Sequence, residues 1–154
     1  MMTTELSIQE SLYPNLTCFG CGNANPRGLH LRSYREDDNF LAEFSPHPEH
    51  DNGFGFLNGG VIATVLDCHG AAAVMWECAV RGIVAPEGAP APFITGSFDV
   101  KFHRPTPLGP IVQLVAVTLT ADPSLISVKS ELNVDGKLRA TMTATWVRFY
   151  PRVR

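Results

Sequence analysis

A single carboxylate interrupts a long apolar stretch of the sequence. Asp67 lies within VIATVLDCHGAAAVMWECAV (61–80), and its neighbours three and four positions away along a helix carry no charge: Ala63, Thr64, Gly70 and Ala71. Burial without an ion pair raises a carboxyl pKa toward neutrality, which suits a general base or acid. Asp67 is therefore the first candidate catalytic residue. The alternative is a structural aspartate that hydrogen-bonds to the backbone or to Thr64.

Two glycines precede this stretch. Gly59 and Gly60 follow Asn58, a favourable helix cap, and leave backbone N–H groups unobstructed at the positive end of a long helix dipole. Such a position can polarise a carbonyl group and stabilise its developing oxyanion. The carboxylate and the helix start together favour acyl chemistry, and a tight turn that simply needs glycine is the alternative.

The spacing of these two features predicts an oligomer. Gly60 and Asp67 are seven residues apart, which at about 1.5 Å per residue is roughly 10 Å along a helix. A carbonyl at the helix start is then beyond the reach of Asp67 from the same chain. A second helix running antiparallel brings its own Asp67 to that position, so we expect a two-fold dimer that is inactive as a monomer.

The element that carries Asp67 is expected to be a buried helix. It is predicted to begin after 58–60, to end near Arg81-Gly82, and to be enclosed on most sides, because small and branched apolar residues occur all around it. The stretch is nearly long enough to span a bilayer, but it contains Asp67, His69 and Glu77, which favour a core helix of a soluble protein.

The remaining elements are expected to be strands. Alternating or continuous apolar patterns predict strands at 29–34, 40–44, 94–102, 111–120, 125–134 and 138–150. Asp135-Gly136 is a strong hairpin signal between the last two. We expect the last four strands to form an antiparallel meander. The predicted fold class is α+β, an antiparallel sheet with one long helix.

Length, composition and charge narrow the class of protein. The chain has 154 residues, 45% of them hydrophobic and 18% charged, which predicts one globular domain over 1–154 with an N-terminal extension to about residue 16. A net charge of −3 argues against nucleic acid or an anionic membrane as partner. Four cysteines and the absence of an apolar signal core in 1–15 predict a cytoplasmic protein.

The cysteines are not expected to bind a metal. Cys18-x-x-Cys21 is half of a zinc signature, but Cys68 and Cys78 lie ten residues apart on different faces of the predicted helix. We therefore predict no metal and no cofactor, and a loop role for Cys18 and Cys21.

Several motifs together resemble the hotdog-fold acyl-CoA thioesterases of the PaaI and THEM4-like group. The matching segments are CFGCG (18–22), NPRGL (25–29), NGGVIATVLD (58–67) and FHRP (102–105) with Gly109. The resemblance covers about residues 16–150 in matching order. It implies a long central helix wrapped by an antiparallel sheet, a homodimer or homotetramer, and hydrolysis of a thioester between an acyl group and CoA.

The resemblance also implies roles for individual residues. Gly60 is expected to supply the N–H that polarises the thioester carbonyl, and Asp67 of the other subunit to act as general base or nucleophile. Asn52 matches a residue that orients water or substrate, and Ser97 one that lies near the carboxylate. The family usually has histidine where this chain has Asn58, and an asparagine cannot donate a proton as an imidazolium does.

Further residues are expected to hold the CoA portion. Gly59 is assigned to substrate binding at the helix start, and the basic end of one strand to the CoA phosphates through Lys101, His103 and Arg104. A solvated strand edge is the alternative for these three residues. His69 stands two positions from Asp67, about 200° around the helix, and is expected to point elsewhere.

The predicted function is hydrolysis of an acyl-CoA thioester to a free acid and CoA. One alternative is a hotdog enoyl-CoA hydratase or dehydratase, which needs an imidazole and a carboxylate converging on the acyl chain, recruited from His69 or His103. Another is a non-catalytic acyl-CoA-binding protein. Aromatic and medium-chain acyl groups are both open.

Overall fold

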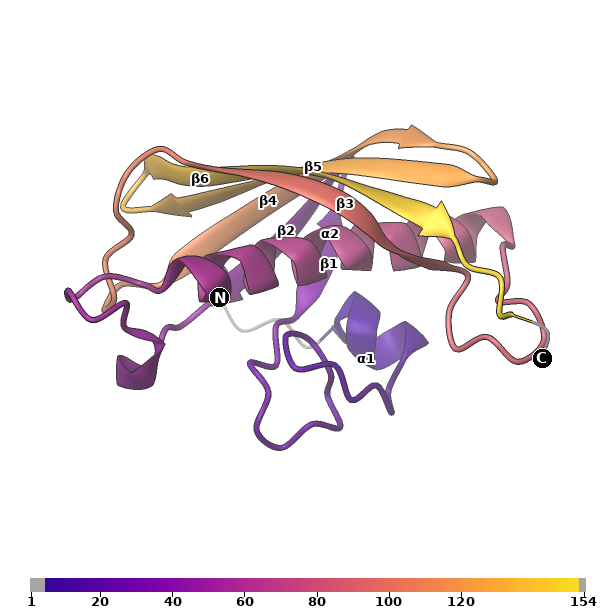
Figure 1. The fold of residues 1–154 in the computed structure, drawn as a ribbon, viewed down its shortest axis with the longest axis horizontal. Helices are drawn as coiled ribbons and strands as arrows, with labels where there is room; N and C mark the ends of the chain where they lie inside the picture. Colours follow the sequence, from indigo (N-terminus) through magenta and orange to yellow (C-terminus); the bar gives the residue numbers. More distant parts are fainter. Residues whose placement is uncertain (1–4, 153–154) are drawn as a thin grey trace.

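A long helix lies against one face of a six-stranded antiparallel sheet (Figure 1). The computed structural model describes residues 5–152. The helices are α1 (Ile8–Leu12), α2 (Gly59–Arg81) and a 3-10 turn, η1 (Pro48–His50). The strands are β1 (Ser33–Glu36), β2 (Asn39–Phe44), β3 (Phe93–Phe102), β4 (Val112–Ala121), β5 (Leu125–Val134) and β6 (Lys137–Arg148). The predicted α+β class is confirmed.

Helix α2 begins and ends as its sequence predicts. The Asn58 side chain accepts hydrogen bonds from the N–H groups of Gly60 and Val61, and Gly82 ends the helix in the left-handed conformation with φ 65°. The helix is long and apolar enough to cross a membrane by length and composition alone. In this fold, however, it packs in the core, where it contacts β2, β3, β4, β5 and β6.

The order of the strands differs from the predicted meander. Strands β4, β5 and β6 form consecutive antiparallel hairpins, but β3 pairs with β6 at the edge, so the sheet order is β1-β2-β4-β5-β6-β3. The prediction that β3 pairs with β4 at the start of the meander was wrong. The connection between them carries Pro105, Pro107 and Pro110, and it leaves the sheet to meet the segment before α2, where Leu57 N–H donates to the Thr106 carbonyl at 2.9 Å.

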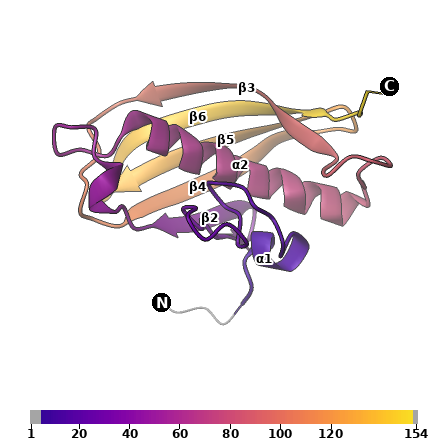
Figure 2. The ribbon, with the colours of Figure 1, turned by 60° about the horizontal axis from the view of Figure 1, so that its bottom comes forward.

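The sheet and the N-terminal segment hold α2 from two sides (Figures 1 and 2). On the sheet side the approach is close, because a methyl group at Gly70 would lie 2.5 Å from a ring carbon of Trp146. The helix face toward β3 is more open, with Ala63, Asp67 and Ala71 only partly buried. Enclosure within one chain is therefore less complete than predicted.

A buried polar network fixes the N-terminal segment to α2. The His69 Nε2 lies 2.9 Å from the Phe40 carbonyl oxygen, which can only accept, so we assign the proton to Nε2. The Nδ1 atom then accepts from the Ser33 hydroxyl at 2.8 Å. Gln9 exchanges two further bonds with Ser33, at 2.9 and 3.2 Å. Burial lowers the pKa of His69 to about 4, so this histidine is a neutral structural residue.

This network predicts a large stability loss on removal of the imidazole. In His69→Leu the Ser33 hydroxyl and the Phe40 carbonyl lose their partner in the core, which costs about 2–4 kcal/mol of unfolding free energy. Urea denaturation measures it. The exposed His103→Ala is the control and is expected to change stability by less than about 0.5 kcal/mol. Equal losses in the two variants would contradict a structural role for His69.

Candidate active site

Asp67 lies on the face of α2 that is turned toward β3. Its Oδ1 accepts a hydrogen bond from Thr95 Oγ1 at 3.0 Å. Burial raises the pKa of Asp67, the bond from Thr95 opposes that rise, and the negative charge of Cys18 adds to it. Thr64 is not the partner, since its hydroxyl donates to the Gly60 carbonyl at 2.9 Å. The carboxylate thus has a raised pKa and one partner, which comes from a distant strand.

The hydroxyl beside the carboxylate is Thr95 and not Ser97. A β-bulge falls between these two residues, so Thr95 pairs with Trp146 while Ser97 pairs with Thr145. Neighbouring strand residues face opposite sides of the sheet. Trp146 faces α2, and Ser97 is therefore on the outer face, where its hydroxyl lies 2.8 Å from that of Thr145. Within one chain, the expected place of Ser97 near Asp67 was wrong.

The start of α2 offers a free N–H at Gly59. The Asn58 Oδ1 accepts from Gly60 N–H at 2.8 Å and from Val61 N–H at 3.3 Å. The expected donor, Gly60, is therefore already satisfied by the cap. Over residues 5–152 no hydrogen bond involves the N–H of Gly59, and a Cβ at this position would lie 3.5 Å from the Phe102 ring. The available donor is one residue earlier than predicted.

Asn52 shapes the loop that leads into α2. Its Oδ1 accepts from Phe54 N–H at 2.8 Å and from Phe56 N–H at 3.3 Å, a local arrangement typical of asparagine in turns. The Asn58 N–H donates to the His50 carbonyl at 2.8 Å and anchors the end of the same loop. Asn52 thus positions the helix start, and its predicted contact with water or substrate stays a prediction.

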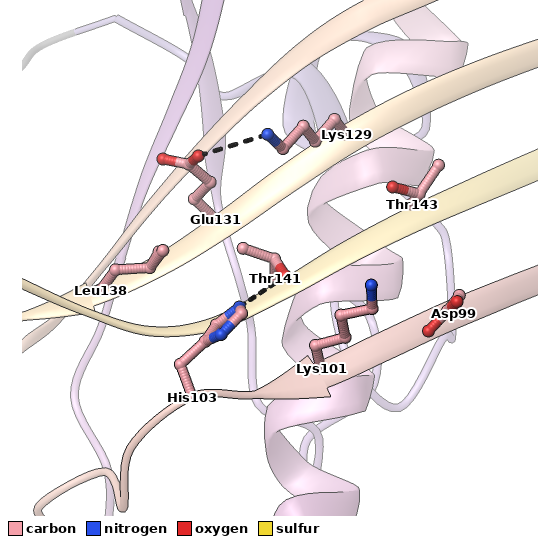
Figure 3. Close-up of a pocket in the computed structure, with 8 residues that line it drawn as sticks. All are labelled: Asp99, Lys101, His103, Lys129, Glu131, Leu138, Thr141 and Thr143. Carbon is pink, nitrogen blue, oxygen red and sulfur yellow. Dashed lines mark hydrogen bonds and ion pairs between the residues drawn. The ribbon is translucent and has the colours of Figure 1, made fainter.

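Two of the three basic residues predicted to contact CoA line a pocket on the outer face of the sheet (Figure 3). Lys101 and His103 border this pocket of about 420 Å³ together with Lys129 and Glu131, which form an ion pair at 3.8 Å. His103 is hydrogen-bonded to Thr141 at 2.9 Å. Arg104 is exposed and does not line the pocket. Asp67 and Gly59 lie on the other side of the sheet, so these basic residues do not converge with them in one chain.

The two histidines considered for hydratase chemistry do not reach Asp67. His69 is held by Ser33 and Phe40 in the core, and His103 points to Thr141 on the outer face of the sheet. Hydration or dehydration of an acyl chain by an imidazole and Asp67 of one chain therefore finds no support in the geometry.

Three cysteines that are distant in sequence come together beside the site. The sulfur atoms of Cys18, Cys21 and Cys68 all lie within 4.8 Å of one another. Hydrogen bonds from the other two thiols, Cys21 first, lower the pKa of Cys18, while hydrogen bonding to Cys18 raises the pKa of Cys21 and Cys68. The sequence did not predict that Cys68 would join Cys18 and Cys21, which it does because the turn at 18–22 packs directly on α2.

Several solved structures similar to this chain are named as thioesterase superfamily proteins or thioesterases. One from Shewanella loihica PV-4 is 27% identical with a TM-score of 0.62, over 83% of this chain and 98% of that one. A phenylacetic acid degradation-related protein from Ralstonia eutropha JMP134 is 24% identical with a TM-score of 0.63, over 77% and 85%. The chain has the hotdog fold of the thioesterase superfamily. The fold implied by the motif resemblance is thereby confirmed.

A third similar structure carries a ligand. It is a Bacillus halodurans protein crystallised with CoA, 22% identical with a TM-score of 0.64, over 80% of this chain and 77% of that one. No family model and no curated protein sequence matches the chain.

One residue of this candidate site, Thr95, was not predicted from the sequence. Thr95 was missed because a regular two-residue period puts it on the same face as Ser97. Gly96 between them was the available signal, since a glycine inside a strand often marks a bulge. Gly59 was predicted to bind substrate, but the role of carbonyl donor was assigned to Gly60, whose N–H is occupied by the Asn58 cap.

The cap itself gives a prediction for this site. In Asn58→Ala the N–H groups of Gly60 and Val61 lose their acceptor, which is expected to lower the unfolding free energy by about 1 kcal/mol. Asn58→Asp keeps an acceptor and adds a charge that the helix dipole favours, so it is expected to retain wild-type stability. Urea denaturation of the three proteins measures both effects. Equal stability of Asn58→Ala and wild type would contradict the cap.

Proposed function

We propose that this hotdog protein hydrolyses an acyl-CoA thioester to a free acid and CoA. The observation that carries the proposal is Asp67, a partly buried carboxyl with a raised pKa and a single hydroxyl partner, because a base of raised pKa takes a proton from water more readily. The free N–H of Gly59 at the N-terminus of a 23-residue helix supports it as the place for the carbonyl oxygen. The CoA-bound Bacillus halodurans structure supports CoA as part of the substrate.

The proposed reaction uses one carboxylate and one backbone donor. Asp67 removes a proton from water, and the water oxygen bonds to the thioester carbonyl carbon. The carbonyl oxygen takes the negative charge and is stabilised by Gly59 N–H. The carbon–sulfur bond then breaks, its electron pair stays on sulfur, and the proton held by Asp67 passes to the leaving thiolate. A free acid and CoA result, with one water consumed.

We further propose that each site is shared by two subunits. Gly59 and Asp67 are eight residues apart on α2, which is about 12 Å along the helix. Edge strand β3 supports a second copy as partner. It is ten residues long with one side unpaired in the described chain, and its helix-facing side leaves Phe98 47% and Phe102 57% exposed. Antiparallel pairing of two β3 strands would cover them and set two α2 helices side by side.

A panel of acyl-CoA substrates tests the chemistry. Thiol release is expected from at least one member, and Asp67→Asn is expected to lower kcat by about a hundredfold or more, because an amide cannot accept the proton. Glu43→Gln, an exposed carboxylate on β2, is the matched control and should keep full activity.

Two outcomes would contradict the chemistry. Near-normal kcat in Asp67→Asn would exclude this carboxylate as the base. Tight binding of acyl-CoA without thiol release from any member would favour the non-catalytic binding protein.

Mixed dimers test the shared site. Gly59→Pro removes the N–H donor at the first helical position, where proline is tolerated, while Gly59→Ala keeps the donor and serves as control. Gly59→Pro and Asp67→Asn homodimers are both expected to be inactive. Refolding the two variants together in equal amounts should restore about a quarter of wild-type activity, because half the dimers are mixed and each holds one intact site. No recovery, or full activity of a species of monomeric mass, would contradict the shared site.

A further inference from the structure

The sulfur cluster beside α2 is built from two separate parts of the fold. Cys18 and Cys21 come from the N-terminal turn and Cys68 from the middle of the helix, and the Cys18 and Cys68 sulfur atoms are 3.7 Å apart. Cys21 and Cys68 are 3% and 6% exposed, and Cys18 is partly exposed. The proposed thioesterase chemistry uses none of the three.

The turn at 18–22 is shaped to present sulfur atoms to one point. Gly22 N–H donates to the Cys18 carbonyl at 2.8 Å and closes the turn. A Cβ at Gly20 would lie 2.3 Å from the Cys68 sulfur, so only glycine permits this approach of the turn to the helix. The closed turn and its close approach to α2 thus bring the three sulfur atoms together.

The sulfur spacing matches a tetrahedral metal better than a disulfide. Zinc–thiolate bonds of about 2.3 Å imply about 3.8 Å between sulfur atoms at tetrahedral angles, close to the 3.7 Å between Cys18 and Cys68. No two sulfur atoms of the cluster are more than 4.8 Å apart, so each pair can reach the zinc spacing if its distance shortens by no more than about 1 Å. A disulfide needs about 2.05 Å between its sulfur atoms, so the Cys18 and Cys68 sulfur atoms, 3.7 Å apart, would have to move further than they would for zinc.

We propose that Cys18, Cys21 and Cys68 bind one zinc ion. The fourth position is left to water, because no further histidine, cysteine, aspartate or glutamate joins the group in the part of the chain that the structure describes. Asp67 is adjacent in sequence, but its Oδ1 is turned to Thr95. On binding, the metal takes three thiolate ligands and their remaining thiol protons pass to solvent. The ion would tie the N-terminal turn to α2. This inference does not depend on the proposed function.

Metal analysis with cysteine variants tests the site. The full chain is produced in zinc-supplemented medium, purified without chelator and analysed by elemental mass spectrometry, with about one zinc per chain expected. Cys18→Ser and Cys68→Ser are each expected to reduce the zinc content at least tenfold. Cys78→Ser is the matched control, since Cys78 is a free, buried cysteine on the same helix outside the cluster, and it should keep the metal.

Cobalt(II) gives a second readout that reports the ligands themselves. Added to the chelator-treated chain, it is expected to give a thiolate-to-cobalt charge-transfer band and the intense visible bands of a tetrahedral site, both lost in Cys18→Ser. Because Cys68 is buried, its replacement can disturb folding, so circular dichroism is used to check that Cys68→Ser folds. Cys18 is partly exposed, and Cys18→Ser therefore tests the site with less risk to the fold.

Three results would overturn the proposal. The first is a reduced, folded wild-type chain that contains less than about a tenth of a zinc per chain and gives no cobalt–thiolate band. The second is an equal zinc content in wild type and in folded Cys18→Ser. The third is a Cys18–Cys68 disulfide, identified by peptide mass mapping, in protein that binds no metal after reduction.

Discussion

The rotational setting of α2 against the sheet is the constraint on which the rest of the structure depends. Each residue turns the helix by about 100°, so consecutive side chains meet different parts of the fold. Asp67 hydrogen-bonds to Thr95 on β3, and Cys68 contacts the turn at 18–22. His69 joins the buried polar network, and Gly70 lies against the ring of Trp146. The close contact at Gly70 and the buried bonds of His69 fix this setting, and with it the direction in which Asp67 and Cys68 point.

Local patterns were enough to predict the elements but not their order in the sheet. The bounds of α2 followed from Asn58 and Gly82, and the β5–β6 hairpin from Asp135-Gly136, because caps and tight turns depend on residues that are close in sequence. The place of β3 beside β6 depends on pairing between residues such as Phe93 and Arg148, which no local period encodes. The prediction failed where a long, proline-rich connection allowed more than one neighbour.

The candidate site was predictable to the extent that one helix carries it. Asp67 was identified because its helical neighbours are apolar, which is a local property. The hydroxyl beside Asp67 was predicted to be that of Ser97. The prediction failed because a bulge at one glycine changes which side chains of β3 face the helix. The association of Cys68 with the Cys18 turn spans fifty residues and depends on how the N-terminal segment packs, so the spacing of the cysteines did not predict it. Long-range packing therefore determined the partner of Asp67 and the cysteine cluster.

The exposed edge at β3 has a consequence for how this chain behaves while it folds. The opposite edge of the sheet, β1, is only four residues long. Strand β3, in contrast, is ten residues long with one side unpaired in the described chain, and its Phe98 and Phe102 side chains are about half exposed. Long, apolar edges are templates for non-specific strand addition. An isolated, newly made chain is therefore at its most aggregation-prone while this edge is unpaired, and slow formation of the proposed dimer would lower its soluble yield.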